Sequence, residues 1–135
     1  MASFQKFNSF VEALAEKTHN LGSDTLKVAL TNSAPVATNT VLANITEVSY
    51  ANLSSRTLTV SSSAQSSGTY KLVLADLTLT ATGAVGPFRY IVIYNDTASN
   101  DELIGWYDYG SSVTLANGDT FVLDFDGTNG VLQLV

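Results

Sequence analysis

The sequence contains no cysteine, and this absence excludes disulfide bonds and thiolate metal sites. Its one histidine is His19, and no Cys–His pair, G-x-S-x-G elbow, Walker loop or H-E-x-x-H motif occurs. Asp101 and Glu102 are adjacent, and Asp124 and Asp126 are two apart. Such spacing is more typical of a solvated loop and strand face than of the paired carboxyls of a glycosidase. We therefore expect a protein that is not an enzyme, with no catalytic residues and no cofactor.

Positive charge is also scarce. Six Lys and Arg stand against twelve Asp and Glu, so the formal net charge is −6. Such a chain repels phosphate backbones and anionic membranes, so we expect neither nucleic acid nor a membrane as a partner. No apolar run approaches the ~20 residues of a membrane span, and the start M-A-S-F-Q-K lacks the apolar region of a secretory signal. We expect synthesis in a cytoplasm.

The last acidic stretch, Asp124 to Gly130 (D-F-D-G-T-N-G), has some of the oxygen-bearing residues of a calcium loop. It lacks the further ligands and the bidentate Glu of an EF-hand, and Asp-Gly and Asn-Gly are ordinary turn formers. We expect a turn and no metal site, although the sequence leaves open whether Asp124 and Asp126 bind a cation.

What the sequence does contain is apolar residues (45%) together with a Ser-, Thr- and Asn-rich polar fraction and only 13% charged residues. This composition favours a β-rich extracellular or virion protein. The length of 135 residues indicates a single domain over 1–135, with an N-terminal helix and cap over 1–22 and a β-sandwich over 23–135.

The N-terminal spacing predicts an amphipathic helix over 3–19, capped by Ser3 and stopped near Gly22. Its apolar stripe consists of Phe4, Phe7, Val11 and Leu14, with Phe10 beside them. This stripe either packs on the sheet or docks into a groove of a partner.

Short strands at spacings of about 8–12 residues, joined by turn residues, predict an antiparallel β-sandwich or barrel of about nine strands. Strands are expected over 25–31, 56–61, 70–74, 88–94, 103–109, 113–115, 120–125 and 131–135. After a phase change near Ala75-Asp76 the apolar pattern continues at Leu77 and Leu79, and 41–45 is either a short strand or a helical turn. The polar run 61–68 is predicted to be a loop. Asn117-Gly118 predicts a hairpin between the strands on either side of it.

Aromatic residues gather in the second half of the chain. By residue parity, four tyrosines should share a face opposite Ile91, Ile93, Ile104 and Trp106. One face then lines the core, and the other is covered by the helix, by loops or by another subunit. The residues that we consider candidates for a subunit interface are Phe4, Phe7, Phe10, Tyr90, Tyr94, Tyr107 and Tyr109.

Four segments resemble small structural proteins of tailed bacteriophages. They are Phe7 to Asn32 (F-N-S-F-V-E-A-L-A-E-K…H-N-L-G-S-D-T-L-K-V-A-L-T-N), Pro87 to Thr97 (P-F-R-Y-I-V-I-Y-N-D-T), Leu103 to Gly110 (L-I-G-W-Y-D-Y-G), and the closing G-D-T-F-V-L-D-F-D…G-V-L. The resemblance implies a virion protein of the head or the tail, made in the bacterial host cytoplasm. It implies no catalytic residues.

The hypothesis we favour is a capsid decoration (cement) protein that binds the outer shell as a symmetric oligomer, with a trimer favoured. Its partners would be other copies of itself and the major capsid protein. The alternatives are a tail-tube, adaptor or fibre-base protein, whose partner would be a tail protein, and a carbohydrate-binding module in which Trp106 and the tyrosines stack on sugars.

Overall fold

Residues 2–135 are mainly β with antiparallel sheets, as the strand spacing predicts, and they contain one α-helix. The computed structural model describes residues 2–135. Within these residues nine strands form three sheets, one of four strands, one of three and one of two, and the sheets do not close into a barrel.

The largest sheet has the strand order β1-β7-β6-β2. Its strands are β1 (Gln5–Lys6), β7 (Leu103–Leu115), β6 (Val85–Asn95) and β2 (Leu26–Thr31). Strand β6 lies between β7 and β2, and residues on both of its faces are buried. The run 88–94 is apolar on both sides, which fits this central position.

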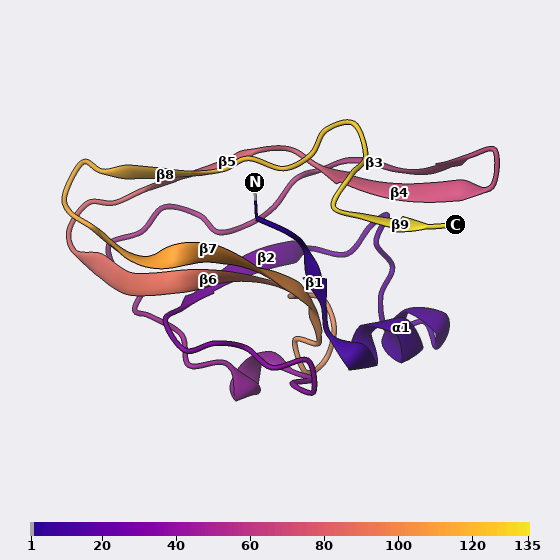
Figure 1. Cartoon of the computed structure of the whole chain (residues 1–135), viewed down its shortest axis with the longest axis horizontal. Helices are drawn as coiled ribbons and strands as arrows, with labels where there is room; N and C mark the ends of the chain where they lie inside the picture. The colour runs from indigo at the N-terminus through magenta and orange to yellow at the C-terminus, as the bar shows by residue number, and fades with distance from the viewer. Residues whose placement is uncertain (1) are drawn as a thin grey trace.

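The two smaller sheets lie together on one side of the large sheet, as Figure 1 shows. The three-stranded sheet joins β3 (Val60–Ser66), β4 (Thr69–Leu74) and β9 (Leu132–Leu134). The two-stranded sheet pairs β5 (Leu77–Thr80) with β8 (Thr120–Leu123). The break between β4 and β5 falls at Ala75-Asp76, where the apolar phase changes.

The main core lies between the large sheet and the smaller ones, where Ile91, Ile93 and Ile104 pack with Leu72, Leu79 and other buried residues. A second cluster lies on the opposite face of the large sheet and includes Phe7, Val92, Tyr94 and Leu103. The loop that carries the 3-10 helix η1 (Leu42–Asn44) contributes Ile45 to this second cluster, and in Figure 1 that loop runs below the large sheet. Both faces of the large sheet are therefore covered over part of its length. No helix among residues 2–135 is long and apolar enough to cross a membrane.

The helix predicted over 3–19 is shorter than expected. Helix α1 spans Asn8–Ala15, because residues 5–6 pair with β7 as strand β1, and the Phe7 N–H donates to the Ile104 carbonyl oxygen at 3.2 Å. Ser3 therefore caps nothing, and the N-cap position falls at Phe7. The helix is closed by Lys17 in a left-handed conformation (φ 72°), with the Thr18 N–H bonded to the Ala13 carbonyl, and not by Gly22.

The predicted loop over 61–68 is mostly strand. Strand β3 occupies Val60–Ser66 and pairs with β4 through a two-residue turn, in which Ser67 and Gly68 both have positive φ (51° and 84°). Strand β3 is a polar strand at a sheet edge and has no apolar alternation, which is why its sequence resembles a loop.

The predicted strand over 56–61 is wrong in its first half. Residues 56–58 lie outside the named strands and run beside β2, where the Val28 N–H donates to the Arg56 carbonyl.

The predicted hairpin at Asn117-Gly118 is also wrong. The turn exists, with the Asp119 N–H donating to the Ala116 carbonyl oxygen at 3.0 Å. However, β8 pairs with β5 and not with β7, so this turn carries the chain from the large sheet across the core to the two-stranded sheet. The predicted short strand 113–115 is the end of β7.

Candidate functional site

A register shift in β7 decides which aromatic side chains share a face. Ile93 is opposite Gly105, but Tyr94 is opposite Leu103, so one extra residue, Ile104, is inserted in β7. Such a bulge reverses the parity of every residue beyond it. The sequence-based grouping is therefore wrong. Trp106 packs in the second cluster with Tyr94, while Tyr107 packs against the main core beside Ile91.

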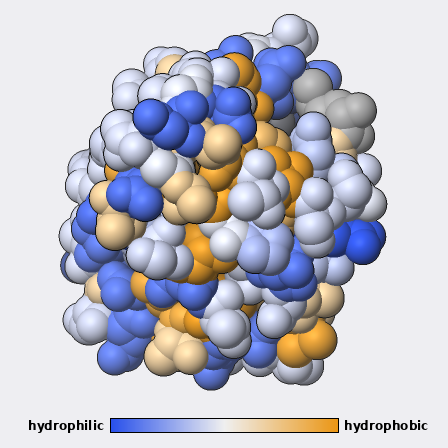
Figure 2. All heavy atoms as spheres, turned by 90° about the vertical axis from the view of Figure 1, so that its left-hand side faces the viewer, coloured by the Kyte–Doolittle hydropathy of each residue, from blue (hydrophilic) through white to orange (hydrophobic). Residues whose placement is uncertain are grey.

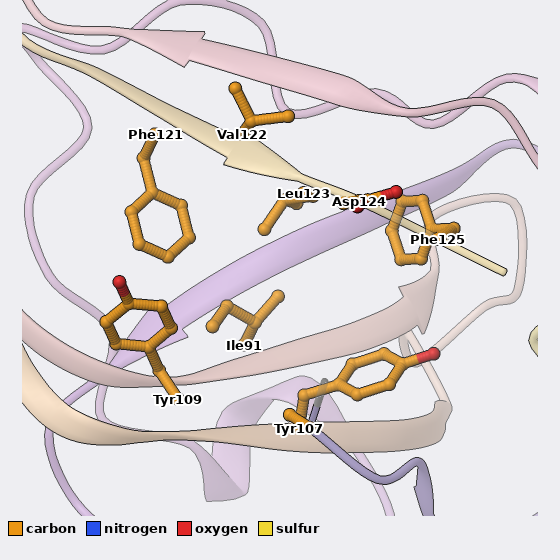
Figure 3. A pocket seen from close by; sticks show the side chains of 9 residues that line it. Ile91, Tyr107, Tyr109, Phe121, Val122, Leu123, Asp124 and Phe125 are labelled. Carbon is orange, nitrogen blue, oxygen red and sulfur yellow. The ribbon is translucent and has the colours of Figure 1, made fainter.

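An apolar groove of about 320 Å³ lies between β7 and β8. Figure 3 shows Phe121, Leu123 and Phe125 pointing from the β8 side toward Tyr109, Ile91 and Tyr107 on the large sheet, while Val122 points away. We call this feature the aromatic groove. Its lining residues are Ala2, Ile91, Tyr107, Tyr109, Phe121, Val122, Leu123, Asp124 and Phe125.

The aromatic rings of the groove contact one another in pairs. The Tyr109 and Phe121 ring centroids are 5.0 Å apart at an interplanar angle of 65°, an edge-on geometry favoured by the ring quadrupoles. At the other end of the groove, the ring centroids of Tyr107 and Phe125 are 6.2 Å apart. Tyr109 and Val122 are 54% and 55% exposed, so the groove ends in apolar surface that is open to solvent. Apolar side chains also reach the surface at the end of the molecule near β8, where Figure 2 shows an irregular apolar band between polar residues.

Two strand edges border the groove. Strand β8 has β5 as its one neighbour within the described chain, so its other edge is unpaired. Strand β7 pairs with β1 only at Gly105 and Trp106, and its edge from Tyr107 onward lies outside that ladder. Unpaired strand edges present backbone donors and acceptors that can pair with another chain. The groove therefore lies beside backbone groups with which an extended chain could pair.

The charges around the groove are negative. Asp124 lines it and is exposed, and neither Asp124 nor Asp119 has an ion pair among residues 2–135. Burial, aided by the charge of Asp126, raises the pKa of the Tyr107 hydroxyl to about 12, so that this tyrosine is neutral near pH 7. The other carboxylate beside the groove strands, Asp108, is neutralised by a bidentate pair with Arg89 at 2.8 and 3.1 Å.

The loop considered as a calcium site is a self-contained turn. One Asp126 carboxylate oxygen accepts the backbone N–H groups of Thr128 and Asn129, both at 2.8 Å, and the other accepts the Asn129 amide at 3.0 Å. These hydrogen bonds lower the pKa of Asp126. Asp124 and Asp126 do not converge, because Asp124 lies in the groove lining and Asp126 caps its own turn. Among residues 2–135 no three His, Asp or Glu side chains gather as metal ligands.

The remaining interface candidates occupy different places. Phe7 and Phe10 are buried in the protomer (0% and 3% exposed), and Tyr94 is 3% exposed, so these three contribute to packing and offer no surface. Phe4 packs edge-on against Tyr107 at 5.7 Å and covers one end of the groove side of β7. The half-buried Tyr90 lies beside Arg89. Of the seven candidates, the groove brings together Tyr107 and Tyr109.

The one histidine is part of a buried polar cluster away from the groove. The Asn95 amide nitrogen donates to Asp24 at 2.7 Å and contacts His19 Nδ1 at 2.9 Å, while His19 Nε2 and the Glu102 Oε2 atom are buried without a hydrogen-bond partner. Burial lowers the pKa of His19, and the nearby carboxylates of Glu102 and Asp24 offset this in part. His19 is the last residue of the helix predicted over 3–19, but it lies beyond the end of α1, where desolvation favours its neutral form.

The groove residues that the sequence analysis missed are Phe121, Val122, Leu123 and Phe125. Their alternation along 121–125 is visible in the sequence, but the expected hairpin would have placed them in the same sheet as β7. Because β8 crosses to the other layer, its aromatic face looks across at Tyr109 and Tyr107 instead of lying beside them.

Comparison of the chain with protein-family models, with curated proteins and with solved structures found no match.

Proposed function

We propose that this chain is a virion structural protein of a tailed phage, a capsid decoration protein that binds the outer shell as a symmetric oligomer and stabilises it. The observation that carries the proposal is the aromatic groove, an apolar surface bordered by two unpaired strand edges. Tyrosine and other aromatic residues are enriched where proteins contact one another, because they give large contact areas with few rotatable bonds. The resemblance of four segments to phage structural proteins supports the same assignment.

The layered sheets suit this role as a rigid scaffold. We propose that the two layers form an open β-sandwich, in which the groove is the opening between the large sheet and β8. A symmetric oligomer, with a trimer favoured, would present one groove per subunit, and several weak contacts would then act together through their high effective concentration. The acidic character of the chain, with seven acids and no Lys or Arg after Arg89, fits an exterior position away from packaged DNA.

The experiment is to mix the purified chain with phage heads that lack it and to separate bound from free protein by sedimentation. A decoration protein co-sediments with intact heads and raises the temperature at which they release DNA. Recovery of the protein with purified tails alone would overturn this proposal in favour of a tail-tube, adaptor or fibre-base role.

A carbohydrate-binding role is favoured by one observation, the exposed ring of Tyr109. Trp106 is less suited to stack on a sugar, because it is half-buried and its ring centroid lies 4.6 Å from that of Phe7. A glycan array probed with the labelled chain tests this alternative: binding that Tyr109→Ala removes would support it.

A further inference from the structure

The outer edge of β8 has backbone groups in position to accept another strand. The Ala81 N–H donates to the Asp119 carbonyl oxygen at 2.9 Å, so this carbonyl lies on the β5 side, while the Thr80 carbonyl accepts from Ser54 on the far side of β5. Backbone groups alternate in direction along an antiparallel strand, so those of Phe121 and Leu123 face β5, and those of Thr120 and Val122 face away. Val122 therefore presents an N–H and a carbonyl at the free edge.

A strand added at this edge would lie over the mouth of the aromatic groove. Alternate side chains of an extended chain point to opposite faces, so every second side chain would enter the groove between Phe121 and Tyr109. Main-chain hydrogen bonds would give affinity, and the groove would select apolar side chains. The groove and the free edge thus form one continuous surface for the same ligand.

The charges at the two ends of β8 indicate what kind of strand fits. Strand β8 (Thr120–Leu123) is flanked by Asp119 and Asp124, whose carboxylates are both exposed. The two aspartates are five residues apart, so their side chains lie on opposite faces of the strand, and β8 of a second copy offers no basic residue to either of them. A strand that carries Lys or Arg at each end of a short apolar run meets both carboxylates instead.

We propose that β8 accepts an extended segment of a different protein as an added strand, and that this segment carries apolar side chains flanked by basic residues. The inference rests on the proposed function only in naming the source of the segment, which would be the shell protein.

The test uses a fluorescein-labelled peptide Lys-Val-Thr-Val-Thr-Lys and its acidic counterpart Glu-Val-Thr-Val-Thr-Glu, with binding followed by fluorescence anisotropy. The critical variant is V122P, which removes the outward N–H while leaving the β5 ladder its hydrogen bonds, since proline is tolerated at strand edges. V122T is the matched control, because it keeps both the N–H and the β-branched shape. We expect the wild type and V122T to bind the basic peptide alike, V122P to bind at least about tenfold more weakly, and the acidic peptide not to bind.

A second variant, D124K, covers the case in which V122P does not fold. Asp124 is exposed, and the charge change leaves the backbone intact. This variant should therefore bind the basic peptide more weakly, and the acidic peptide more tightly, than the wild type does. No binding of the basic peptide to the wild type, or equal binding by folded V122P, would overturn the inference. Dimers in sedimentation velocity that V122P dissociates would assign the edge to a second copy instead.

The two proposals fail in different ways. Wild-type protein that binds the basic peptide but not heads would overturn the decoration function and leave strand addition standing. A folded V122P variant that binds heads as the wild type does would overturn strand addition and leave the decoration function standing.

Discussion

Single residues in this chain have roles that depend on burial more than on residue type. The three N-terminal phenylalanines differ in this way: Phe7 lies wholly inside the second cluster, Phe10 lies in the main core, and Phe4 covers Tyr107 at the groove. Val11, on the same helix as Phe10, is 51% exposed. Stability and surface function are thus separable by choosing among neighbouring apolar residues.

We expect Phe7→Ala to lower the free energy of unfolding by about 3–5 kcal/mol, because it removes a fully buried ring and leaves a cavity against Trp106. The control Val11→Ala should change it by less than about 0.5 kcal/mol. Urea denaturation followed by tryptophan fluorescence measures both. Equal effects of the two substitutions would show that Phe7 is not a core residue.

His19 makes the stability of the fold depend on pH. Its pKa is lowered in the folded state by burial, so the unfolded chain binds a proton that the folded chain resists. Stability should therefore fall as the pH is lowered through about 6.5, the pKa of an unperturbed histidine, and continue to fall toward the lower folded value. The variant His19→Gln should lose this part of the dependence. Thermal melts of the wild type and His19→Gln between pH 7.5 and 5.5 test this. An equal fall in melting temperature for both proteins would show that His19 is not the source of the pH dependence.

At the scale of elements, strand β1 fastens the N-terminal segment to the edge of β7. A Cβ on Gly105 would overlap the Phe4 ring and the Gln5 carbonyl oxygen, so only glycine allows this close approach. The short β1 pairing closes the part of the groove opening that Phe4 covers and leaves the Tyr109 end open.

Gly105→Ala should therefore destabilise the fold by about 1–3 kcal/mol, the usual cost of overpacking, and should loosen residues 2–6. Gly127→Ala is the matched control, since nothing lies within 4 Å of a Cβ there and its φ is not in the left-handed region. Denaturant midpoints and proteolysis near the N-terminus report the two effects. A neutral Gly105→Ala would mean that β1 does not pack at this position.

The sequence predicts the elements with strong periodicity and fails where tertiary structure decides. The two-sided apolar run 88–94 identifies the central strand β6, and the phase change at Ala75-Asp76 marks the end of β4. The bulge at Ile104 leaves no local signal, so the face of Tyr107 could not be derived from parity. Asn117-Gly118 specifies a turn but not which strand β8 pairs with, and for that reason half of the groove was missed.

At the scale of the whole molecule, the distribution of charge and apolar surface bears on the oligomeric state of the chain. Strand edges and aromatic surface favour association, while a net charge of −6 opposes unspecific clustering. We expect the chain to form a small closed oligomer, with a trimer favoured. Sedimentation equilibrium over a range of concentrations measures its mass, and a monomer at high concentration would contradict the oligomeric part of the proposal.

The most direct test of the proposed function is the binding of the purified protein to heads that lack it, with V122T and V122P beside the wild type. We predict that wild type and V122T co-sediment with heads at a fixed ratio and raise their thermal stability, and that V122P binds much more weakly. Absence of wild-type protein from the head fraction, with recovery in tails, would contradict the account.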